Sequence, residues 1–203
     1  RLDDMDVAAR DHVVVMRGVS WETYLQIDHD RGGDKWPRLA FLDGELEIAS
    51  PHGREHELRK TLMARFLEAF AEERGVSLNG FGNTTFADKA RQAGLEPDVC
   101  YYVGDGDPPL DPPHLALEVA ITSGGVDKLE IYRRFGVREV WFWKNDALVI
   151  YQLRADGYAL AFASALLPAL DIEAFSKLVR TTNPSRQTEA VRAYRTSLRA
   201  TGG

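Results

Sequence analysis

One carboxylate interrupts an otherwise apolar run of the sequence. Glu118 lies in the middle of Leu115-Ala-Leu-Glu-Val-Ala-Ile121, which is typical of a strand buried on both faces. Because side chains alternate along a strand, Glu118 shares its face with Ala116 and Ala120, whose small side chains leave room above it. A buried carboxylate is costly unless a cation pairs with it. The run therefore predicts either a ligand or metal site at Glu118 or a structural ion pair.

A second carboxylate stands near the start of another predicted strand. Asp98 follows Pro97 in the run Pro97–Val103, where it would share a face with Cys100 and Tyr102. Two carboxylates on neighbouring strands repel each other unless a cation lies between them. Mg²⁺ (or Mn²⁺) suits such a site, because it takes a few carboxylates together with water and substrate phosphate oxygens. We therefore expect Asp98 and Glu118 to be metal ligands, although Asp98 alone would also suit a turn residue.

A lysine follows the acidic strand at the beginning of a predicted helix. Lys128 lies in the first turn of Val126–Phe135, where a cation is unfavourable with the helix dipole. Its flexible side chain could reach Glu118 and Asp98, orient an attacking water molecule and stabilise negative charge that develops on a phosphoryl group. The alternative is an ordinary solvated lysine.

Three further candidates lie in the N-terminal half of the chain. Glu45 and Glu47 occupy the same face of a predicted strand, and either could be a third acidic group or part of an exposed hairpin face. His56 lies in the first turn of the long helix predicted for Glu55–Arg74. It leans toward the core side of that helix, so it could be a core histidine, a metal neighbour or a proton carrier.

The elements that must position these residues have clear sequence signals. Asp43-Gly44 joins the strands Leu39–Leu42 and Glu45–Ala49 into a tight hairpin. Ser20 is a plausible cap for a helix that begins at Trp21, and Gly75 ends the long helix. Further strands are predicted over Val76–Phe86 (broken by Gly80 and Gly82), Glu139–Trp143, Leu148–Leu153 and Tyr158–Phe162. Helices that alternate with buried strands predict an α/β fold with a mixed sheet covered on both faces.

The composition is that of a globular chain. It has 203 residues, of which 44% are hydrophobic and 28% are charged, and its net charge of −6 argues against a general nucleic-acid binder. A single cysteine, a charged N-terminal segment and the absence of a long apolar stretch favour a cytoplasmic protein without a membrane span. We expect one domain over residues 1–180 and a basic C-terminal arm or helix over 181–203. That segment could contact phosphates or could be a solvated terminal helix.

Several blocks of the chain, in this order, resemble the Uma2 family (DUF820). The hairpin Asp43-Gly-Glu45 with Ser50-Pro51 and His56 is similar to the N-terminal block of the family. The later blocks are Gly94-Leu-Glu-Pro-Asp98, Leu115-Ala-Leu-Glu-Val119, Asp127-Lys-Leu-Glu-Ile-Tyr132 and Phe135-Gly-Val-Arg-Glu-Val-Trp141. The family consists of predicted endonucleases of the PD-(D/E)XK, or restriction-endonuclease-like, superfamily. The resemblance extends from residue 20 to residue 180, approximately.

The resemblance implies a restriction-endonuclease-like mixed β-sheet flanked by helices, a divalent metal and hydrolysis of phosphodiester bonds in DNA. Asp98 matches the first acid of the superfamily motif and Glu118 the second. The superfamily usually carries its lysine two residues after the second acid, where this chain has Ala120. Lys128 is the replacement that the family pattern suggests, and Glu45 matches the family block better than Glu47 does.

Three functions are compatible with these residues. The first is a Mg²⁺-dependent DNA endonuclease in which Asp98 and Glu118 hold the metal, Lys128 orients the water, and Glu45 and His56 assist. The second is a catalytically weak or inactive nuclease-fold protein that acts as an interaction or assembly module. The third is a metal-dependent hydrolase of a small phosphorylated substrate. A homodimer is also expected, with the aromatic residues of the Trp141 strand and the C-terminal helix as its contact surface.

Overall fold

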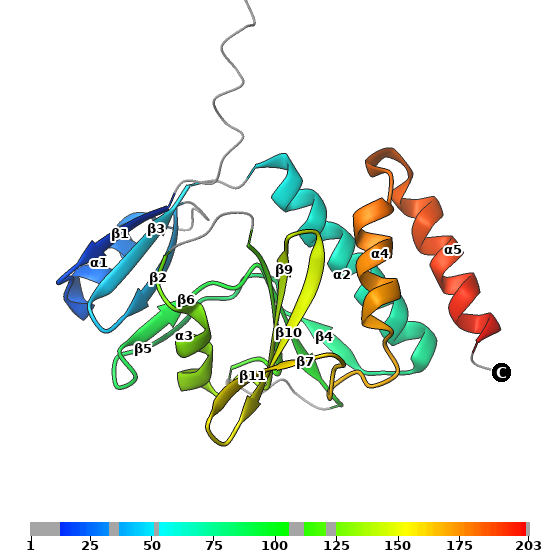
Figure 1. Ribbon diagram of the computed structural model, residues 1–203. Helices are drawn as coiled ribbons and strands as arrows, with labels where there is room; N and C mark the ends of the chain where they lie inside the picture. The colour runs from blue at the N-terminus through cyan, green and yellow to red at the C-terminus, as the bar shows by residue number, and fades with distance from the viewer. Residues whose placement is uncertain (1–12, 33–36, 51–52, 106–111, 121–124, 202–203) are drawn as a thin grey trace, which may run out of the picture.

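The computed structural model describes residues 13–32, 37–50, 53–105, 112–120 and 125–201 (Figure 1). In chain order its elements are β1 (Val13–Arg17), α1 (Trp21–Asp30), β2 (Arg38–Leu42), β3 (Glu45–Ala49), α2 (Arg54–Arg74), β4 (Leu78–Gly80), β5 (Phe86–Asp88), β6 (Ala93–Leu95), β7 (Val99–Val103), β8 (Leu115–Val119), α3 (Lys128–Phe135), β9 (Glu139–Lys144), β10 (Ala147–Arg154), β11 (Gly157–Ala161), α4 (Ile172–Thr181), the 3₁₀ helix η2 (Pro184–Arg186) and α5 (Gln187–Ala200). The residues Pro51 and Ile121, which the sequence analysis placed in a motif block and a strand, lie outside the described segments.

The strands form two sheets, where the sequence predicted a single one. Sheet A has the strand order β1-β3-β2-β6-β5, and every pairing in it is antiparallel. Sheet B has the order β11-β10-β9-β8-β7-β4 and is mixed, because β8 and β9 run parallel while its other pairs are antiparallel. The prediction of an α/β fold with a mixed sheet, flanking helices and an N-terminal hairpin is confirmed.

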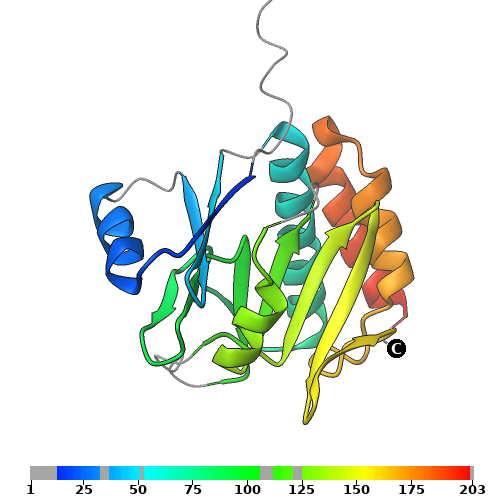
Figure 2. The same ribbon diagram turned by 60° about the vertical axis from the view of Figure 1, so that its left-hand side comes forward.

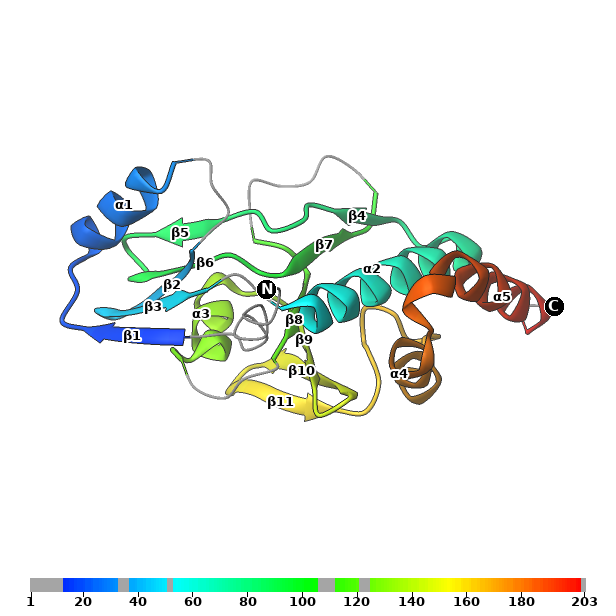
Figure 3. The same cartoon turned by 90° about the horizontal axis from the view of Figure 1, so that it is seen from above.

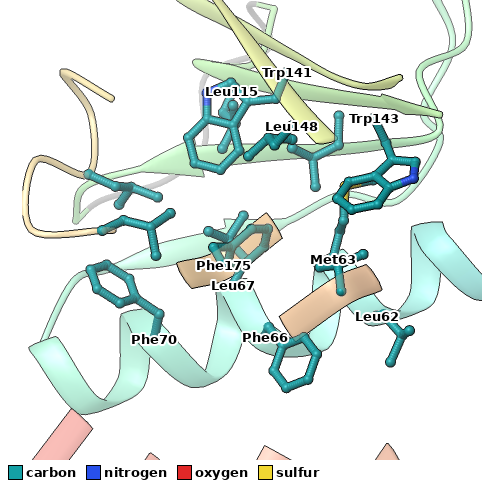
Figure 4. Packing of buried hydrophobic residues seen from close by; sticks show 14 of the residues in the cluster. Leu62, Met63, Phe66, Leu67, Phe70, Leu115, Trp141, Trp143, Leu148 and Phe175 are labelled. Atoms are coloured by element: carbon teal, nitrogen blue, oxygen red, sulfur yellow. The ribbon is translucent and has the colours of Figure 1, made fainter. Parts of the chain in front are cut away.

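The helices cover the sheets in layers. Helix α1 packs on the outer side of sheet A, and α3 lies between the two sheets (Figures 2 and 3). Helices α2, α4 and α5 gather on the opposite face of sheet B, where Leu67 of α2 lies below Trp141 of β9 and Met63 lies below Trp143 (Figure 4). Burial of these apolar faces supplies the main driving force for the layered arrangement.

Strand β8 is buried on both faces, as its sequence predicted. Leu115, Leu117 and Val119 belong to the core that α2 covers, whereas Ala116 belongs to the core around α3. Glu118 alternates with the first group and therefore faces the α3 side of sheet B. The predicted face of Glu118 is correct.

Strand β2 distributes its side chains in the same alternating way. Leu39 and Phe41 pack against α1, whereas Ala40 packs in the core around α3. Arg38 is two residues from Ala40 and therefore also faces the α3 side of sheet A. The register between β2 and β3 places Ala40 opposite Glu47. Sheet A thus sends one cation and one acid toward the helix that separates the sheets.

The turn and helix boundaries follow from local chemistry. Asp43 and Gly44 both have positive φ values, 47° and 86°, as a two-residue hairpin turn requires. Helix α3 begins at Lys128, two residues after the predicted start, because the Asp127 side chain accepts the N–H of Glu130 at 3.1 Å and caps it. Gly75 ends α2 with a φ of 63°, as predicted.

Two predicted strands differ from those observed. The segment predicted as one strand over Val76–Phe86 contributes β4 to sheet B and leads into β5 of sheet A. The strand predicted to begin at Pro97 begins at Val99 instead. The physical reason is that Glu96-Pro97-Asp98 connects β6 in sheet A with β7 in sheet B. The chain changes sheets there, and proline has no N–H to offer a sheet ladder.

The C-terminal residues form a helix that packs on α2. Arg195 forms an ion pair with Glu72 at 2.6 Å, and both Arg195 and Arg199 contact Glu73. Leu198 turns into the core, as do Trp141 and Trp143 of β9. Trp141 and Trp143 are therefore interior residues and cannot form a dimer contact, whereas Phe142 of the same strand and Tyr194 of the C-terminal helix are only partly buried. Among the helices of the described segments, none combines the length and apolar character that crossing a bilayer requires.

Candidate active site

Charged side chains from both sheets converge beside α3. Glu118 comes from β8, and Asp98 comes from the segment that crosses between the sheets. In the register of β7 and β8, Val99 lies opposite Leu117, so one further step along both strands brings Asp98 opposite Glu118. Both carboxylates are buried. The structure thus brings together the two acids that the sequence singled out.

Helix α3 holds Glu118 at both of its oxygen atoms. The Nζ atom of Lys128 donates to Oε2 at 3.1 Å, and the hydroxyl of Tyr132 donates to Oε1. Lys128 and Tyr132 are four residues apart, so they project from the same side of the helix. The predicted reach of Lys128 back to Glu118 is therefore present, and Tyr132 completes the contact.

Among the described residues, Arg38, His56 and Val119 carry hydrogen-bond donors beside Asp98. The Nη1 atom of Arg38 donates to Oδ1, and the main-chain N–H of Val119 donates to Oδ2 at 2.8 Å. The Nε2 atom of His56 lies 3.1 Å from the same Oδ2. His56 is fully buried in the first turn of α2. It is thus a core residue, which is one of the alternatives that its sequence position left open, and it also lies beside the first acid.

Glu47, and not Glu45, extends this cluster. The Oε2 atom of Glu47 accepts the N–H of Val126 at 2.9 Å, and its Oε1 lies 3.9 Å from Nζ of Lys128. Glu45 is further along β3 and accepts a hydrogen bond from the exposed Arg17 at 2.9 Å. The structure therefore does not bring Glu45 to the other candidates, although it is on the same face of the strand.

The residues Gly125 and Val126, shortly before α3, lie directly against Glu47. Gly125 has a φ of 102°, and a Cβ atom built on it would lie 2.0 Å from Oε2 of Glu47. Any other residue would collide with that carboxylate and would also be strained. The glycine at this point of the sequence therefore allows the loop to approach close enough for Val126 to donate to Glu47.

The environment separates the pKa values of the two central acids. Burial would raise the pKa of Asp98, but the hydrogen bond from His56 and the charges of His56, Arg38 and Lys128 hold it well below its ordinary value. Burial raises the pKa of Glu118, and the negative charge of Asp98 adds to that effect against the opposing influence of Lys128. Pairs of acids with separated pKa values are common at functional sites.

Lys128 keeps its proton in this environment. Burial would lower the pKa of its amine, but the carboxylates of Glu118, Glu47 and Asp98 more than offset that effect and raise the pKa. A protonated amine cannot accept a proton. Lys128 can therefore orient a nucleophile or stabilise negative charge, and it is unsuited to act as a general base.

The donor set fits one class of metal ion. Within the described residues, no group of three or more His, Cys, Asp and Glu side chains is arranged to hold a metal by itself. Asp98 and Glu118 are nevertheless hard oxygen donors, and a carboxylate offers about four lone-pair sites. Glu118 receives donors from Tyr132 and Lys128, one at each oxygen. A Mg²⁺-type ion, which keeps water and substrate oxygens in its coordination shell, fits such a pair better than a metal that needs a complete protein cage.

Two residues of this cluster were not found from the sequence. Tyr132 had a usable signal, since it lies four residues after Lys128 on one helix face. Arg38 had none, because an arginine at the beginning of a hairpin strand is usually solvated. Its position depends on the packing of sheet A against α3, which is a long-range property of the fold.

Comparisons with known proteins agree with this architecture. The sequence model of the Uma2 family, described as "Putative restriction endonuclease", matches residues 21–183. A solved structure described as "a putative nuclease belonging to DUF820 from Anabaena variabilis ATCC 29413" aligns with a TM-score of 0.51 and 10% identity, over 78% of this chain and 97% of that one. At this level of identity the alignment establishes likeness of fold. No curated protein matches the chain. Because the family match spans most of its length and every residue of the cluster, this chain belongs to the Uma2 family.

Proposed function

We propose that this protein is a divalent-metal-dependent nuclease that hydrolyses phosphodiester bonds in DNA. The observation that carries the proposal is the pair of buried acids on adjacent segments, Asp98 and Glu118, with the ammonium group of Lys128 at 3.1 Å from Glu118. Two carboxylates and a protonated lysine are the groups that a metal-assisted displacement at phosphorus needs. Membership of the Uma2 family supports the same reaction class.

Asp98 and Glu118 would hold the metal, which we expect to be Mg²⁺ or Mn²⁺. When bound, such an ion supplies positive charge to phosphoryl oxygens and makes water more acidic. His56 and the N–H of Val119 fix the orientation of Asp98, and Tyr132 fixes that of Glu118. Residues that hold ligating carboxylates in this way contribute to both metal affinity and rate.

Lys128 would act on the substrate directly. In the reaction the oxygen of water adds to phosphorus, one bridging P–O bond breaks, and a water proton passes to the leaving oxygen. The protonated amine of Lys128 would orient the water molecule or neutralise charge that develops on the phosphoryl oxygens. Its side chain is 32% exposed, so a substrate can reach it, whereas the carboxylates are nearly inaccessible.

A second candidate is a nuclease-fold protein that does not cleave DNA and serves as an interaction or assembly module. One observation favours it: Asp98 is satisfied by Arg38, His56 and the N–H of Val119, all of which belong to the protein. A buried acid with protein donors can be purely structural. In that case metal ions would neither bind at this cluster nor stabilise the fold.

A homodimer remains part of the proposal, since two sites on two strands suit the cleavage of duplex DNA. The interior position of Trp141 and Trp143 removes these two residues from the surface first considered for it. Sedimentation velocity with and without duplex DNA measures the association state. A monomer under both conditions would limit the protein to one strand at each encounter.

The deciding experiment compares two isosteric variants at buried acids. Glu118→Gln removes one expected metal ligand, whereas Glu96→Gln removes a buried acid that pairs with Arg31 outside the cluster. Mn²⁺ is titrated calorimetrically into the wild type and both variants, and supercoiled plasmid is incubated with each in Mg²⁺ or EDTA. We expect binding and nicking in the wild type and in Glu96→Gln, and neither in Glu118→Gln. A wild type that neither binds Mn²⁺ nor nicks DNA would overturn the proposal in favour of the second candidate.

A further inference from the structure

The cluster has its acids at the floor and its cations toward solvent. The side chains of Asp98 and Glu118 are 2% and 3% exposed, whereas those of Arg38 and Lys128 are 11% and 32% exposed. A ligand that enters from solvent therefore meets the ammonium and guanidinium groups before it meets a carboxylate. The outer part of the site presents positive charge, which attracts an anion.

The two layers of charge suit two different ligands. A divalent cation beside Asp98 and Glu118 would offset the repulsion between these two buried carboxylates. The positive groups of Arg38 and Lys128 would then face a phosphate group that enters from solvent. A metal ion and one backbone phosphate would therefore each meet groups of opposite charge.

Arg38 occupies the point where these two ligands would compete. It begins β2, faces α3 from sheet A and donates through Nη1 to Oδ1 of Asp98. Asp98 is also an expected metal ligand. A guanidinium group carries five N–H donors in a planar fork, which matches the oxygen atoms of a phosphate group. The same arginine can therefore neutralise Asp98 before metal binds and contact a phosphate afterwards.

We propose that Arg38 is a substrate-binding residue, paired with Asp98 in the metal-free protein and transferred to a nonbridging phosphate oxygen of the nucleic-acid backbone when a divalent cation occupies that carboxylate. The inference rests on the proposed nuclease function and adds to it a residue that holds the substrate. Lys128 forms the second half of the same rim beside Glu118.

Because Arg38 and the metal ion would both use Asp98, a change at Arg38 should move the affinities for metal and for DNA in opposite directions. Arg38 competes with the metal ion for Asp98, so Arg38→Met raises the affinity for Mn²⁺. The same variant loses a charge-assisted contact to phosphate, so its affinity for DNA falls by about tenfold. A residue that only supports the fold would lower both affinities together, because loss of the site geometry weakens every ligand.

The experiment measures both affinities on the full chain. Mn²⁺ is titrated calorimetrically, and a fluorescein-labelled DNA duplex is titrated by anisotropy in Ca²⁺ under conditions where the duplex is verified to remain uncleaved. The slope of log K against log salt concentration should fall in magnitude by about one for the loss of one phosphate contact. Arg17→Met is the matched control, because Arg17 also lies on sheet A but is 83% exposed and pairs with Glu45. We expect it to leave the Mn²⁺ affinity unchanged and the DNA affinity close to that of the wild type.

The outcomes separate the inference from the function on which it rests. Tighter Mn²⁺ binding with weaker DNA binding in Arg38→Met supports the inference. If the wild type binds Mn²⁺ and Glu118→Gln does not, but both affinities of Arg38→Met are unchanged or fall together, Arg38 does not exchange partners and the inference alone is overturned. A wild type that binds no Mn²⁺ removes the proposed function and the inference with it. If Arg38→Met does not fold, Arg38→Gln keeps a hydrogen-bond donor for Asp98 but removes the positive charge, and a DNA affinity and salt dependence equal to those of the wild type overturn the inference.

Discussion

The hydroxyl of Tyr132 donates a hydrogen bond to Oε1 of Glu118, and both side chains are buried. This contact links the middle of α3 to the C-terminal end of β8, while Lys128 contacts the other oxygen of the same carboxylate. The orientation of Glu118 is therefore set by one helix. Burial, together with the charge of Glu118, raises the pKa of the Tyr132 hydroxyl far above its ordinary value, so Tyr132 acts as a hydrogen-bond donor and not as a proton carrier.

Replacement of Tyr132 by phenylalanine should weaken both the fold and the metal site. Loss of a hydrogen bond to a charged group lowers the free energy of unfolding by about 1.5–3 kcal/mol, as urea denaturation would measure. Tyr101→Phe is the control. The Tyr101 hydroxyl donates to Glu68 over a distance of 3.1 Å, and this pair lies outside the cluster. Both variants should lose stability, and only Tyr132→Phe should bind Mn²⁺ more weakly. Equal Mn²⁺ affinity in both would reduce Tyr132 to a structural residue.

Gly125→Ala should disturb Glu47 in addition to straining the backbone. The φ of 102° costs about 1–3 kcal/mol for a residue with a side chain, and the new Cβ would lie 2.0 Å from Oε2 of Glu47. Gly104→Ala provides the strain without a clash, since its φ is 118° and nothing lies within 4 Å of the added atom. Thermal unfolding should show a larger loss for Gly125→Ala. The excess should disappear in a Glu47→Ala background, and an excess that persists would locate the clash elsewhere.

Alternation along single strands was sufficient to predict much of the site. The apolar run around Glu118 identified a strand buried on both faces, and its period of two assigned Glu118 to the face of Ala116. The hairpin, the long helix and the ends of α2 and α3 follow from turn and capping residues that act over a few positions. Such local signals do not depend on which elements pack together, and therefore they transfer directly to the folded structure.

The remainder of the site depends on contacts between distant segments. Period-two alternation cannot separate Glu45 from Glu47, because both occupy one face of β3. The difference arises from their partners: Glu47 lies opposite Ala40 and against Gly125, whereas Glu45 lies beside Arg17. Arg38 reaches Asp98 only because the chain forms two sheets with α3 between them. A prediction of a single sheet cannot show which residues of two separate sheets face each other across α3.

The two acids of β3 therefore make a matched pair for mutation. Glu47→Ala should lower the affinity for Mn²⁺ on the order of tenfold, because it removes a negative charge beside Lys128 and the acceptor for the N–H of Val126. Glu45→Ala removes an exposed pair with Arg17 and should leave the Mn²⁺ affinity and the stability nearly unchanged. Calorimetric titration of both variants is the measurement. If Glu45→Ala lowered the Mn²⁺ affinity more than Glu47→Ala did, Glu45 would be the third acidic group, as the family block suggested.

The contact between α2 and α5 should make the fold sensitive to acid. Hydrogen bonds from Arg199, aided by Arg195 against the opposing effect of burial, lower the pKa of Glu73 from 4.5 to about 2. A carboxyl group whose pKa is lower in the folded state stabilises the fold above its unfolded pKa, and this contribution is lost as the pH falls from 4.5 toward 2.

Glu73→Gln should accordingly have a lower melting temperature than the wild type at neutral pH, and the difference should shrink as the pH falls from 4.5 toward 2. Glu72→Gln is the neighbouring control, because the Glu72 side chain is 64% exposed and solvent screens its pair with Arg195. Melting temperatures of the three proteins across this range test the assignment. A difference between wild type and Glu73→Gln that stays constant with pH would mean that the loss comes from altered packing of α5 and not from the charge of Glu73.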